Sequence, residues 1–128
     1  MIYLDTSVAL AHLFAEDRRP TEALWKERLV SSRLLEYELW NRFHATPAAA
    51  PYRDDVKGLL AAVSFFELSP TVLARALEPF PVRVRTLDAF HLATMLFAMD
   101  QGQKVRLATY DRRMLDAARA LAIPLVSF

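Results

Sequence analysis

Cysteine is absent from this 128-residue sequence, and glycine occurs only twice, at Gly58 and Gly102. Without cysteine the chain has no disulfide, no thiolate zinc site and no cysteine nucleophile. The two glycines lie 44 positions apart and cannot form a glycine-rich phosphate-binding loop, which excludes P-loop and dinucleotide-binding proteins. The lack of cysteine fits a reducing compartment, and Met1 is not followed by a basic leader with a long apolar core. We therefore expect a cytoplasmic protein.

Long hydrophobic runs are absent as well. The strongest apolar segment is uncharged only over residues 89–99, which is 11 residues, whereas a transmembrane helix needs roughly 20. We therefore expect no membrane association. Hydrophobic residues nevertheless make up 54% of the chain, enough to form a core, and this excludes an intrinsically disordered protein. The length predicts a single domain comprising residues 1–128.

Excess charge of one sign is also lacking. The formal net charge of +1 argues against a protein that binds nucleic acid through its overall charge. The basic residues are nevertheless uneven, with 13 arginines against 3 lysines. Because the planar guanidinium group binds phosphates in a bidentate manner, this bias is compatible with an RNA or DNA partner. Codon bias in a GC-rich genome explains it equally well.

Leucine and alanine together number 40, whereas valine and isoleucine number 11, which favours helices joined by short strands. The expected strands lie at residues 2–4, 29–30, 65–68, 104–109 and 125–126. The expected helices lie at about residues 8–14, 20–28, 33–44, 52–63, 70–77, 86–99 and 111–122. Ser31 or Ser32 is expected to cap the third helix, and Thr86 the sixth. The alternation predicts one α/β domain with a short, mainly parallel central sheet and helices on both faces.

Four acidic residues are placed to meet at one edge of such a sheet. Asp5 directly follows the first expected strand, and Asp111 lies two residues beyond Thr109, where another strand ends. Glu38 and Asp88 lie on helices that follow strand or extended segments. Because helices leave a parallel sheet at the carboxyl ends of its strands, where ligands bind, all four acids can approach one rim.

Each of these acids also has a simpler structural interpretation. Asp5 and Asp111 are favourable N-cap residues. Asp88 is the only charged residue in an apolar helix, but its place in the first turn suits the helix dipole. Glu38 stands four positions before Arg42, the spacing of a surface ion pair on a helix. Taken singly, none of the four acids identifies a site.

The acids are more informative as a set. Four carboxylates at one rim repel each other, by about 1 kcal/mol for each pair at 4 Å in water and about 4 kcal/mol at an effective dielectric constant of 20. A bound cation relieves this repulsion. Oxygen ligands without cysteine favour Mg²⁺ or Mn²⁺ over zinc. Carboxylate-bound Mg²⁺ is well suited to polarising a phosphodiester and activating water.

Four segments carry these acids in a recognisable pattern. They read I-Y-L-D-T-S-V-A-L near the N-terminus, S-S-R-L-L-E-Y-E-L ending at Leu39, T-L-D-A-F-H-L-A-T from Thr86 and L-A-T-Y-D-R-R-M-L from Leu107. In this order, with 33, 50 and 23 positions between successive acids, they resemble the PIN-domain ribonucleases, and most closely the VapC-like toxins of toxin–antitoxin modules. The resemblance extends over essentially the whole chain.

The resemblance implies an endoribonuclease that hydrolyses RNA phosphodiester bonds with Mg²⁺ or Mn²⁺, the toxin of a type II toxin–antitoxin system. The metal ligands it implies are Asp5, Glu38, Asp88 and Asp111. Thr109 matches the family threonine that supports the site by hydrogen bonding. Glu38 is favoured over Glu36 because it lies six residues after Ser32, although Tyr37 replaces the small residue that the family usually has before this glutamate.

The resemblance also implies a cognate antitoxin that covers the site and a homodimer. Arg33, Arg42, Arg112 and Arg113 neighbour the acidic motifs and are candidate RNA-phosphate contacts, or else solvated charges on helix faces. His91, three residues after Asp88, is expected to be a packing residue and not a general base.

Three other functions remain as alternatives. A PIN-like domain that binds RNA without cutting it differs only in activity. A receiver-like regulator would use Asp54 or Asp55 as phosphoacceptor with Lys104, but both aspartates fall in an expected helix and Asp5 lacks an acidic neighbour. A haloacid-dehalogenase-type phosphatase needs an aspartate two residues after its nucleophile, where this chain has Ser7.

Overall fold

A four-stranded parallel sheet forms the centre of the protein, in the spatial order β3-β2-β1-β4. This is a computed structural model that describes residues 1–14, 20 and 22–127. The strands are β1 (Ile2–Leu4), β2 (Leu29–Ser32), β3 (Val63–Phe66) and β4 (Arg106–Ala108). Ile2 of β1 lies opposite Leu29 on one side and Arg106 on the other.

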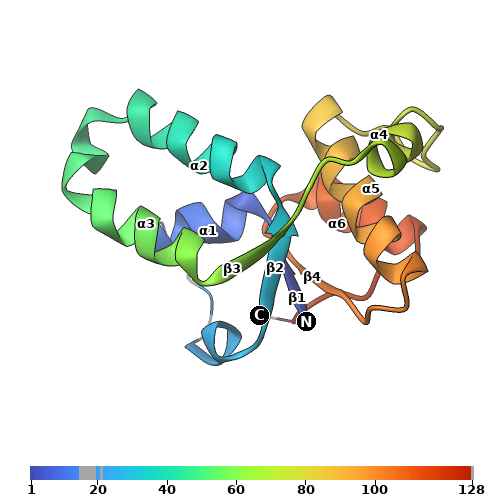
Figure 1. Cartoon of the computed structure of the whole chain (residues 1–128), viewed down its shortest axis with the longest axis horizontal. Coiled ribbons are helices and arrows are strands. Elements are labelled where there is room, and N and C mark those ends of the chain that lie inside the picture. The colour runs from blue at the N-terminus through green and yellow to red at the C-terminus, as the bar shows by residue number, and fades with distance from the viewer. Residues whose placement is uncertain (15–19, 21, 128) are drawn as a thin grey trace.

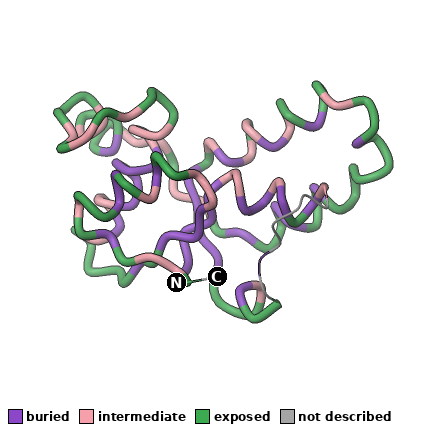
Figure 2. The backbone as a smooth tube through the Cα atoms, turned by 180° about the vertical axis from the view of Figure 1, so that it is seen from behind, coloured by how far each residue is buried: buried purple, intermediate pink, exposed green. Residues whose placement is uncertain are grey.

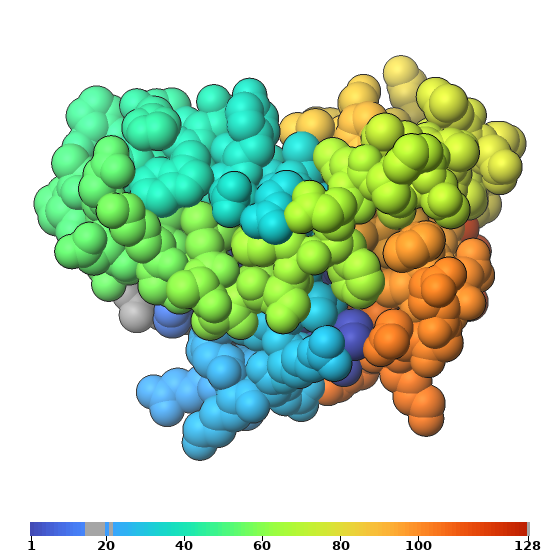
Figure 3. Space-filling model, viewed as in Figure 1, coloured from blue at the N-terminus to red at the C-terminus, as the bar shows by residue number. Residues whose placement is uncertain are grey.

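Helices cover both faces of this sheet. They are α1 (Thr6–Leu13), α2 (Leu34–Ala45), α3 (Arg53–Ala61), α4 (Pro70–Ala76), α5 (Thr86–Asp100) and α6 (Arg112–Ala120), with 3₁₀ turns η1 (Glu22–Lys26) and η2 (Pro47–Tyr52). Figure 1 shows α1, α2 and α3 on one side of the strands and α4, α5 and α6 on the other. The surface shows the same division into a lobe from the first half of the chain and a lobe from the second (Figure 3). The predicted α/β fold is confirmed.

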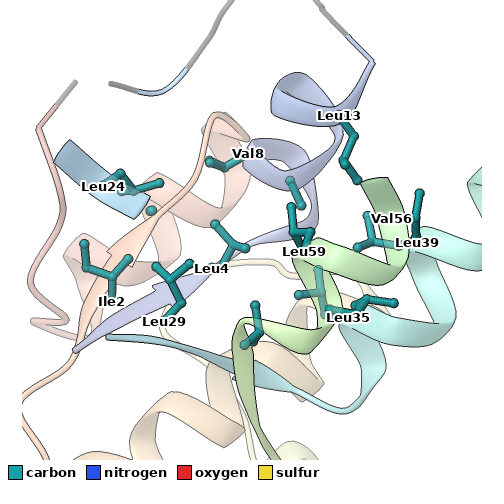
Figure 4. Packing of buried hydrophobic residues seen from close by; sticks show 14 of the residues in the cluster. Ile2, Leu4, Val8, Leu13, Leu24, Leu29, Leu35, Leu39, Val56 and Leu59 are labelled. Atoms are coloured by element: carbon teal, nitrogen blue, oxygen red, sulfur yellow. The ribbon is translucent and has the colours of Figure 1, made fainter. Parts of the chain in front are cut away.

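The two central strands, β1 and β2, are fully buried, because successive side chains point to opposite faces of a sheet and both faces are covered. Ile2 and Leu4 pack with α1, α2 and α3 in one core (Figure 4), whereas Tyr3 between them packs with α5 and α6 in another. Figure 2 accordingly shows the buried residues mainly in the strands and on the sides of the helices that face them. A functional consequence is that Tyr3 points toward α5, the helix that carries Asp88.

Local signals fix several helix starts. Asp5, Ser69 and Asp111 are the N-caps of α1, α4 and α6, and each accepts a hydrogen bond from a backbone N–H of its own first turn. The expected cap at Thr86 is wrong, because Arg85 is the N-cap of α5 and Thr86 its first residue.

The expectation that Ser31 or Ser32 caps α2 needs correction, because both serines end β2 and the N-cap is Arg33. Ser31 Oγ instead donates to the carbonyl of Leu4, which joins β2 to the end of β1. Ser32 Oγ still accepts a hydrogen bond from Leu34 N, so it supports the helix start from within the strand.

Other elements are shorter than expected. The helix expected at residues 20–28 is the 3₁₀ turn η1, with Thr21 outside the described residues. The strand expected at residues 104–109 is reduced to β4, and that at 125–126 to one bridge between Leu107 and Leu125. Among the described helices, none is both long and apolar enough to cross a lipid bilayer.

Candidate functional site

Asp5 lies where β1 ends and α1 begins, and its carboxylate is held by two neighbouring strand ends. Its Oδ2 accepts hydrogen bonds from Ser7 N at 3.3 Å, Ser7 Oγ at 2.6 Å and Thr109 Oγ1 at 2.7 Å. The backbone N–H of Asp5 donates to the carbonyl of Ala108 at 3.0 Å, which joins β1 to β4. We refer to Asp5, Ser7 and Thr109 as the β1–β4 corner.

The two hydroxyl groups of the β1–β4 corner extend this network along the chain that leaves β4. Ser7 Oγ accepts from the backbone N–H of Tyr110 at 3.0 Å, and Thr109 Oγ1 accepts from that of Asp111 at 3.0 Å. The supporting hydrogen bond expected of Thr109 is therefore present. Sequence analysis missed Ser7 as a site residue, although its place two positions after a capping aspartate was the available signal.

Asp111 caps α6, with Oδ1 accepting from the backbone N–H of Arg113 at 2.9 Å. Its structural role as a cap, like that of Asp5, is therefore real. Capping engages only part of a carboxylate, because each of the two oxygens has more than one lone pair. Both residues thus combine the two alternatives that their sequence positions left open, a helix cap and a negative charge at the carboxyl edge of the sheet.

Asp88 lies in the first turn of α5 and differs from the other acids. Its Oδ2 is buried and has no hydrogen-bond partner in the part of the chain that the structure describes. Burial raises the pKa of Asp88, the nearby negative charge of Asp111 raises it further, and Asp5 adds to the effect, while a backbone hydrogen bond at Arg85 opposes it. Asp88 is therefore an unsatisfied carboxyl group that lies within the electrostatic reach of two further carboxylates.

Glu38 points into the protein from α2. Its Oε1 lies 2.6 Å from Nε2 of His91, and its side chain is 18% exposed. The surface pair with Arg42 considered from the sequence does not form. Glu36, the competing glutamate, is 43% exposed and pairs with Arg33 at 3.4 Å. The structure thus favours Glu38 over Glu36 as the inward-facing acid.

His91 is 2% exposed and joins three elements. Beyond its contact with Glu38, its Nδ1 lies 2.6 Å from Tyr3 Oη, which accepts from the backbone N–H of Ser32 at 3.1 Å. Burial alone would lower the pKa of His91, but the hydrogen bond and charge of Glu38, with smaller contributions from Asp5 and Asp88, raise it. Burial raises the pKa of Tyr3, which therefore remains a neutral phenol. His91 is packed in the interior, as expected, but it also carries a polar connection that the sequence did not reveal.

Asp5, Asp88 and Asp111 lie within electrostatic reach of one another, and Glu38 is linked to the same region through His91, but the four acids do not form a ready-made ligand cluster. Within the part of the chain that the structure describes, no three acidic or histidine side chains are gathered as a metal site. Asp5, Glu38 and Asp111 are instead each held by partners on their own side of the edge. The potential metal ligands are all oxygen atoms, and the buried Oδ2 of Asp88 has no partner among the described residues. This donor set fits a hard divalent cation, which would neutralise the repulsion between Asp88 and its acidic neighbours.

The arginines differ in availability. Arg33, an expected phosphate contact, is bound to Glu67 at 2.7 Å and lies 4.6 Å from the ring centre of Phe65. Arg113 instead lines a cavity of about 550 Å³ together with Arg83 and Arg85. None of these three cavity-lining arginines forms an ion pair with an acid in the described ranges.

This arginine-lined cavity adjoins the acidic edge through two helix starts. Arg85 is the N-cap of α5, which carries Asp88, and Arg113 lies in the first turn of α6, which Asp111 caps. Sequence analysis missed Arg83 and Arg85, because the segment before α5 contains no family motif. Their alternation in the run R-V-R was the only available signal.

The receiver-like alternative does not fit the structure. Asp54 and Asp55 are exposed in the first turn of α3, and neither follows a strand. A phosphoacceptor of that class must lie at the carboxyl end of a strand, next to the acids of the first strand. The acids that follow strands are instead Asp5 after β1, Glu67 after β3, which pairs with Arg33, and Asp111 after β4.

Comparisons with known proteins agree with this geometry. The PIN-domain family model matches residues 2–120. Ribonuclease VapC35 of Mycobacterium tuberculosis is 32% identical over 133 residues, covering 99% of this chain and 96% of the relative. Ribonuclease VapC46 of the same species is 41% identical over 69 residues, covering 53% of this chain and 51% of the relative.

A solved structure shares the fold. A chain in the crystal structure of VapBC2 from Rickettsia felis, bound to a DNA fragment from their promoter, superimposes with a TM-score of 0.71, covering 98% of both chains. At 16% identity this likeness concerns the fold alone. The family predicted from the four sequence segments is thus confirmed: the chain belongs to the PIN-domain family and, within it, to the VapC ribonucleases.

Proposed function

We propose that this protein is an endoribonuclease that hydrolyses RNA phosphodiester bonds with Mg²⁺ or Mn²⁺, and that it is the toxin of a type II toxin–antitoxin system. Membership of the VapC ribonucleases supports the nuclease activity. The structural observation that carries the proposal is Asp88, whose buried Oδ2 has no partner beside the charges of Asp111 and Asp5. An arrangement of this kind is costly for folding and useful for binding a cation.

The metal would be held by Asp5, Glu38, Asp88 and Asp111. A divalent cation at such a site polarises the phosphodiester and makes a water molecule more acidic. The protein itself orients the acids: the hydroxyls of Ser7 and Thr109 fix Asp5, and the turns that begin α5 and α6 place Asp88 and Asp111. Because these groups are in place before substrate arrives, little reorganisation is needed during the reaction.

The arginine-lined cavity supplies the contact with RNA. Arg83, Arg85 and Arg113 have no acidic partner among the described residues, so their guanidinium groups are available to phosphate oxygens. The net charge of +1 makes a local basic site necessary, because the protein as a whole does not attract polyanions. An RNA substrate also accords with the cytoplasmic location expected from the sequence.

RNA cleavage with Mg²⁺ or Mn²⁺ tests the activity. We expect Asp5→Asn and Asp88→Asn each to reduce cleavage of total RNA by at least about 100-fold, because even hydrogen-bond partners of metal ligands contribute about 10–100-fold. Asparagine is as good an N-cap as aspartate, so Asp5→Asn keeps the start of α1. Asp54→Asn, at an exposed acid on α3, is the matched control. Unchanged cleavage by both site variants would reject the assigned site.

RNA binding is tested separately, by fluorescence anisotropy of a labelled single-stranded RNA with the Asp5→Asn variant. Adding Arg83→Ala, Arg85→Ala or Arg113→Ala should weaken binding and reduce the salt slope by about 0.7 for each phosphate that the protein no longer neutralises. Arg119→Ala, at the other end of α6, should not. Binding by the wild type without any cleavage would instead assign the protein as a non-catalytic RNA-binding domain.

Two protein partners belong to the same proposal. The structural neighbour is a VapBC complex, which supports an antitoxin partner for this chain, and the family resemblance supports a homodimer. Three large apolar side chains are exposed and available to such partners: Leu73 on α4, Leu77 at the C-cap of α4, and Leu87 on α5. Co-expression with the product of the adjacent upstream gene, followed by light scattering of the purified protein, tests both. A strictly monomeric protein that does not bind this product would contradict them.

A further inference from the structure

Tyr3, His91 and Glu38 form a buried polar chain to which the proposed metal and RNA contacts assign no function. It runs from the backbone N–H of Ser32 to Tyr3 Oη at 3.1 Å, from Tyr3 Oη to His91 Nδ1 at 2.6 Å, and from His91 Nε2 to Glu38 Oε1 at 2.6 Å. Tyr3 and His91 are 0% and 2% exposed. Both ring nitrogens of His91 are therefore engaged inside the protein.

The direction of the hydrogen bond between His91 and Glu38 follows from chemistry alone. A carboxylate only accepts hydrogen bonds, so Nε2 of His91 carries the hydrogen and donates to Glu38. This holds whether the imidazole is neutral or protonated, since Nδ1 can either accept from Tyr3 or donate to it. The hydrogen bond uses one carboxylate oxygen of Glu38 and leaves the other oxygen for a further ligand.

The chain connects three elements that carry acidic residues of the site. Tyr3 lies on β1, two residues before Asp5, and His91 lies one helical turn after Asp88 on α5. Ser32 ends β2, directly before the helix that carries Glu38. The partners are 88 and 53 positions apart in the sequence, so these hydrogen bonds fix the relative placement of elements that no local signal connects.

We propose that Tyr3 and His91 are positioning residues that hold the Glu38 carboxylate at the acidic edge of the sheet, beside Asp5 and Asp88. This inference rests on the proposed metal-dependent function. A glutamate side chain has several rotatable bonds, and a fixed hydrogen bond removes much of the entropy that it would lose on ligation. Metal-ligating carboxylates are commonly oriented by such hydrogen bonds.

Two other roles for His91 fit the structure less well. A general base must reach the proton that it removes, directly or through one water molecule. His91 has both nitrogens occupied and is 2% exposed, so it does not meet this requirement. A role in packing alone explains the burial of His91, but it requires neither a hydrogen-bond partner at each nitrogen nor partners from two other elements.

Mn²⁺ affinity, measured by calorimetry on the purified full-length chain, tests the proposal without depending on activity. Tyr3→Phe removes one oxygen and keeps the ring, and His91→Leu removes both hydrogen bonds. We expect each to weaken Mn²⁺ binding by about 10–100-fold, approaching the effect of Glu38→Gln. His91→Gln should recover part of the loss, because its amide nitrogen can replace Nε2 as the donor to Glu38.

Ser69→Ala, which removes the cap of α4, is the control for a general loss of stability. If Tyr3→Phe lowers the melting temperature as Ser69→Ala does and leaves Mn²⁺ affinity unchanged while Glu38→Gln weakens it, the positioning role is wrong and the proposed function stands. If His91→Gln binds Mn²⁺ normally but no longer cleaves RNA, His91 acts in proton transfer and the proposal fails. Absence of Mn²⁺ binding by the wild type would overturn both proposals.

Discussion

Asp5 and Asp88 lie at the same edge of the sheet, but the protein treats the two carboxylates in opposite ways. At the β1–β4 corner, Oδ2 of Asp5 accepts three hydrogen bonds from Ser7 and Thr109. On the α5 side, Oδ2 of Asp88 is buried without a partner, and burial and its acidic neighbours raise the pKa of the group. One acid is thus stabilised and oriented by the fold, whereas the other destabilises it.

The difference shows how the site divides its tasks. Hydrogen-bond donors around Asp5 fix the direction of one carboxylate and also reduce its need for a counter-charge. Donors around Asp88 in the same number would satisfy that group and weaken any cation held there. In the proposed site, the unsatisfied Asp88 would supply affinity for a cation, and the rigid β1–β4 corner would fix the cation's position. Substitutions on the two sides of the edge should therefore have different consequences.

Among variants that keep all four acids, removing the rigid β1–β4 corner should have the largest effect. Thr109→Val keeps the shape of the side chain but removes the donor to Asp5 and the acceptor for the N–H of Asp111. We expect Mn²⁺ affinity and RNA cleavage to fall by about 10–100-fold, and the free energy of unfolding to fall by about 1–3 kcal/mol because buried polar groups lose their partners. Calorimetry and chemical denaturation measure the two quantities. Thr46→Val, on a more exposed hydroxyl at the end of α2, should change neither binding nor cleavage.

Adding a divalent cation should neutralise Asp88 and so remove the difference in stability between the Asp5 side and the Asp88 side of the sheet edge. At a Mn²⁺ concentration of 100 times the dissociation constant, the free energy of unfolding should rise by about 2.7 kcal/mol. Asp88→Asn should lose most of this gain, because the unsatisfied charge is the part that a cation neutralises. Thermal melting with and without Mn²⁺ measures the effect. An equal Mn²⁺ shift in wild type and Asp88→Asn would place the cation elsewhere.

Without a divalent cation, the charge of Asp88 should lower the stability of the folded protein. Because the pKa of Asp88 is raised, the folded protein binds a proton there at pH values where the unfolded chain does not. Stability therefore falls as pH rises above the ordinary aspartate pKa of about 3.9, and the deprotonated group opposes folding at neutral pH. Asp88→Asn should raise the melting temperature at pH 7 by no more than about a few degrees, because Asp88 is only partly buried and solvent screens its charge.

The pH profile of melting checks the same prediction. In the weakly acidic range, the wild type should gain stability on acidification relative to Asp88→Asn. The raised pKa of His91 also makes stability fall as pH rises, and Asp88→Asn should keep most of this contribution, because Glu38 is its main source and Asp88 adds only a smaller part. By contrast, Asp5→Asn should lower the melting temperature, because a neutral amide oxygen accepts the three hydrogen bonds of Oδ2 more weakly than a carboxylate oxygen does. A loss of stability in Asp88→Asn as well would favour a simple role at the helix start.

The smallest effect on stability and Mn²⁺ binding is expected for an acid that lies outside the acidic edge of the sheet. Glu36→Gln removes a charge that is largely in solvent, two residues before Glu38 on the same helix. We expect its free energy of unfolding to stay within about 0.5 kcal/mol of the wild type, with Mn²⁺ affinity unchanged. Glu38→Gln is the matched comparison, since it alters the acid bound to His91. Equal effects of the two variants on Mn²⁺ binding would contradict the choice of Glu38.

Much of the fold was predictable because its signals are local. The first strand has the predicted bounds, Ile2–Leu4, and the capping preferences of Asp5, Ser69 and Asp111 correctly mark three helix starts. The N-terminal part of β2 was also foreseen, but Ser31 and Ser32 were misjudged as caps. Serine suits both caps and strand ends, and the hydrogen bond from Ser31 to the carbonyl of Leu4 that decides between them is a tertiary contact.

The site was predictable only in part. The order and spacing of Asp5, Glu38, Asp88 and Asp111 were sufficient to identify the family, and their role as metal ligands remains a prediction. The partners of these acids could not be foreseen in the same way. From the sequence, Arg42, one helical turn away, was the obvious partner of Glu38. The actual partner is His91, which lies 53 positions away and approaches Glu38 only in the folded chain.

The sequence by itself determined which residue types follow each strand, because strand alternation, helix caps and turn preferences act over a few neighbouring positions. It thereby placed acidic side chains at the carboxyl ends of parallel strands. Tertiary structure decided which of those acids receive donors and which do not, because burial and hydrogen bonding across the sheet depend on segments far apart in the sequence, 53 positions for Glu38 and His91 and 104 for Asp5 and Thr109. The difference between the hydrogen-bonded carboxylate of Asp5 and the unsatisfied Oδ2 of Asp88 therefore arises only in the folded chain.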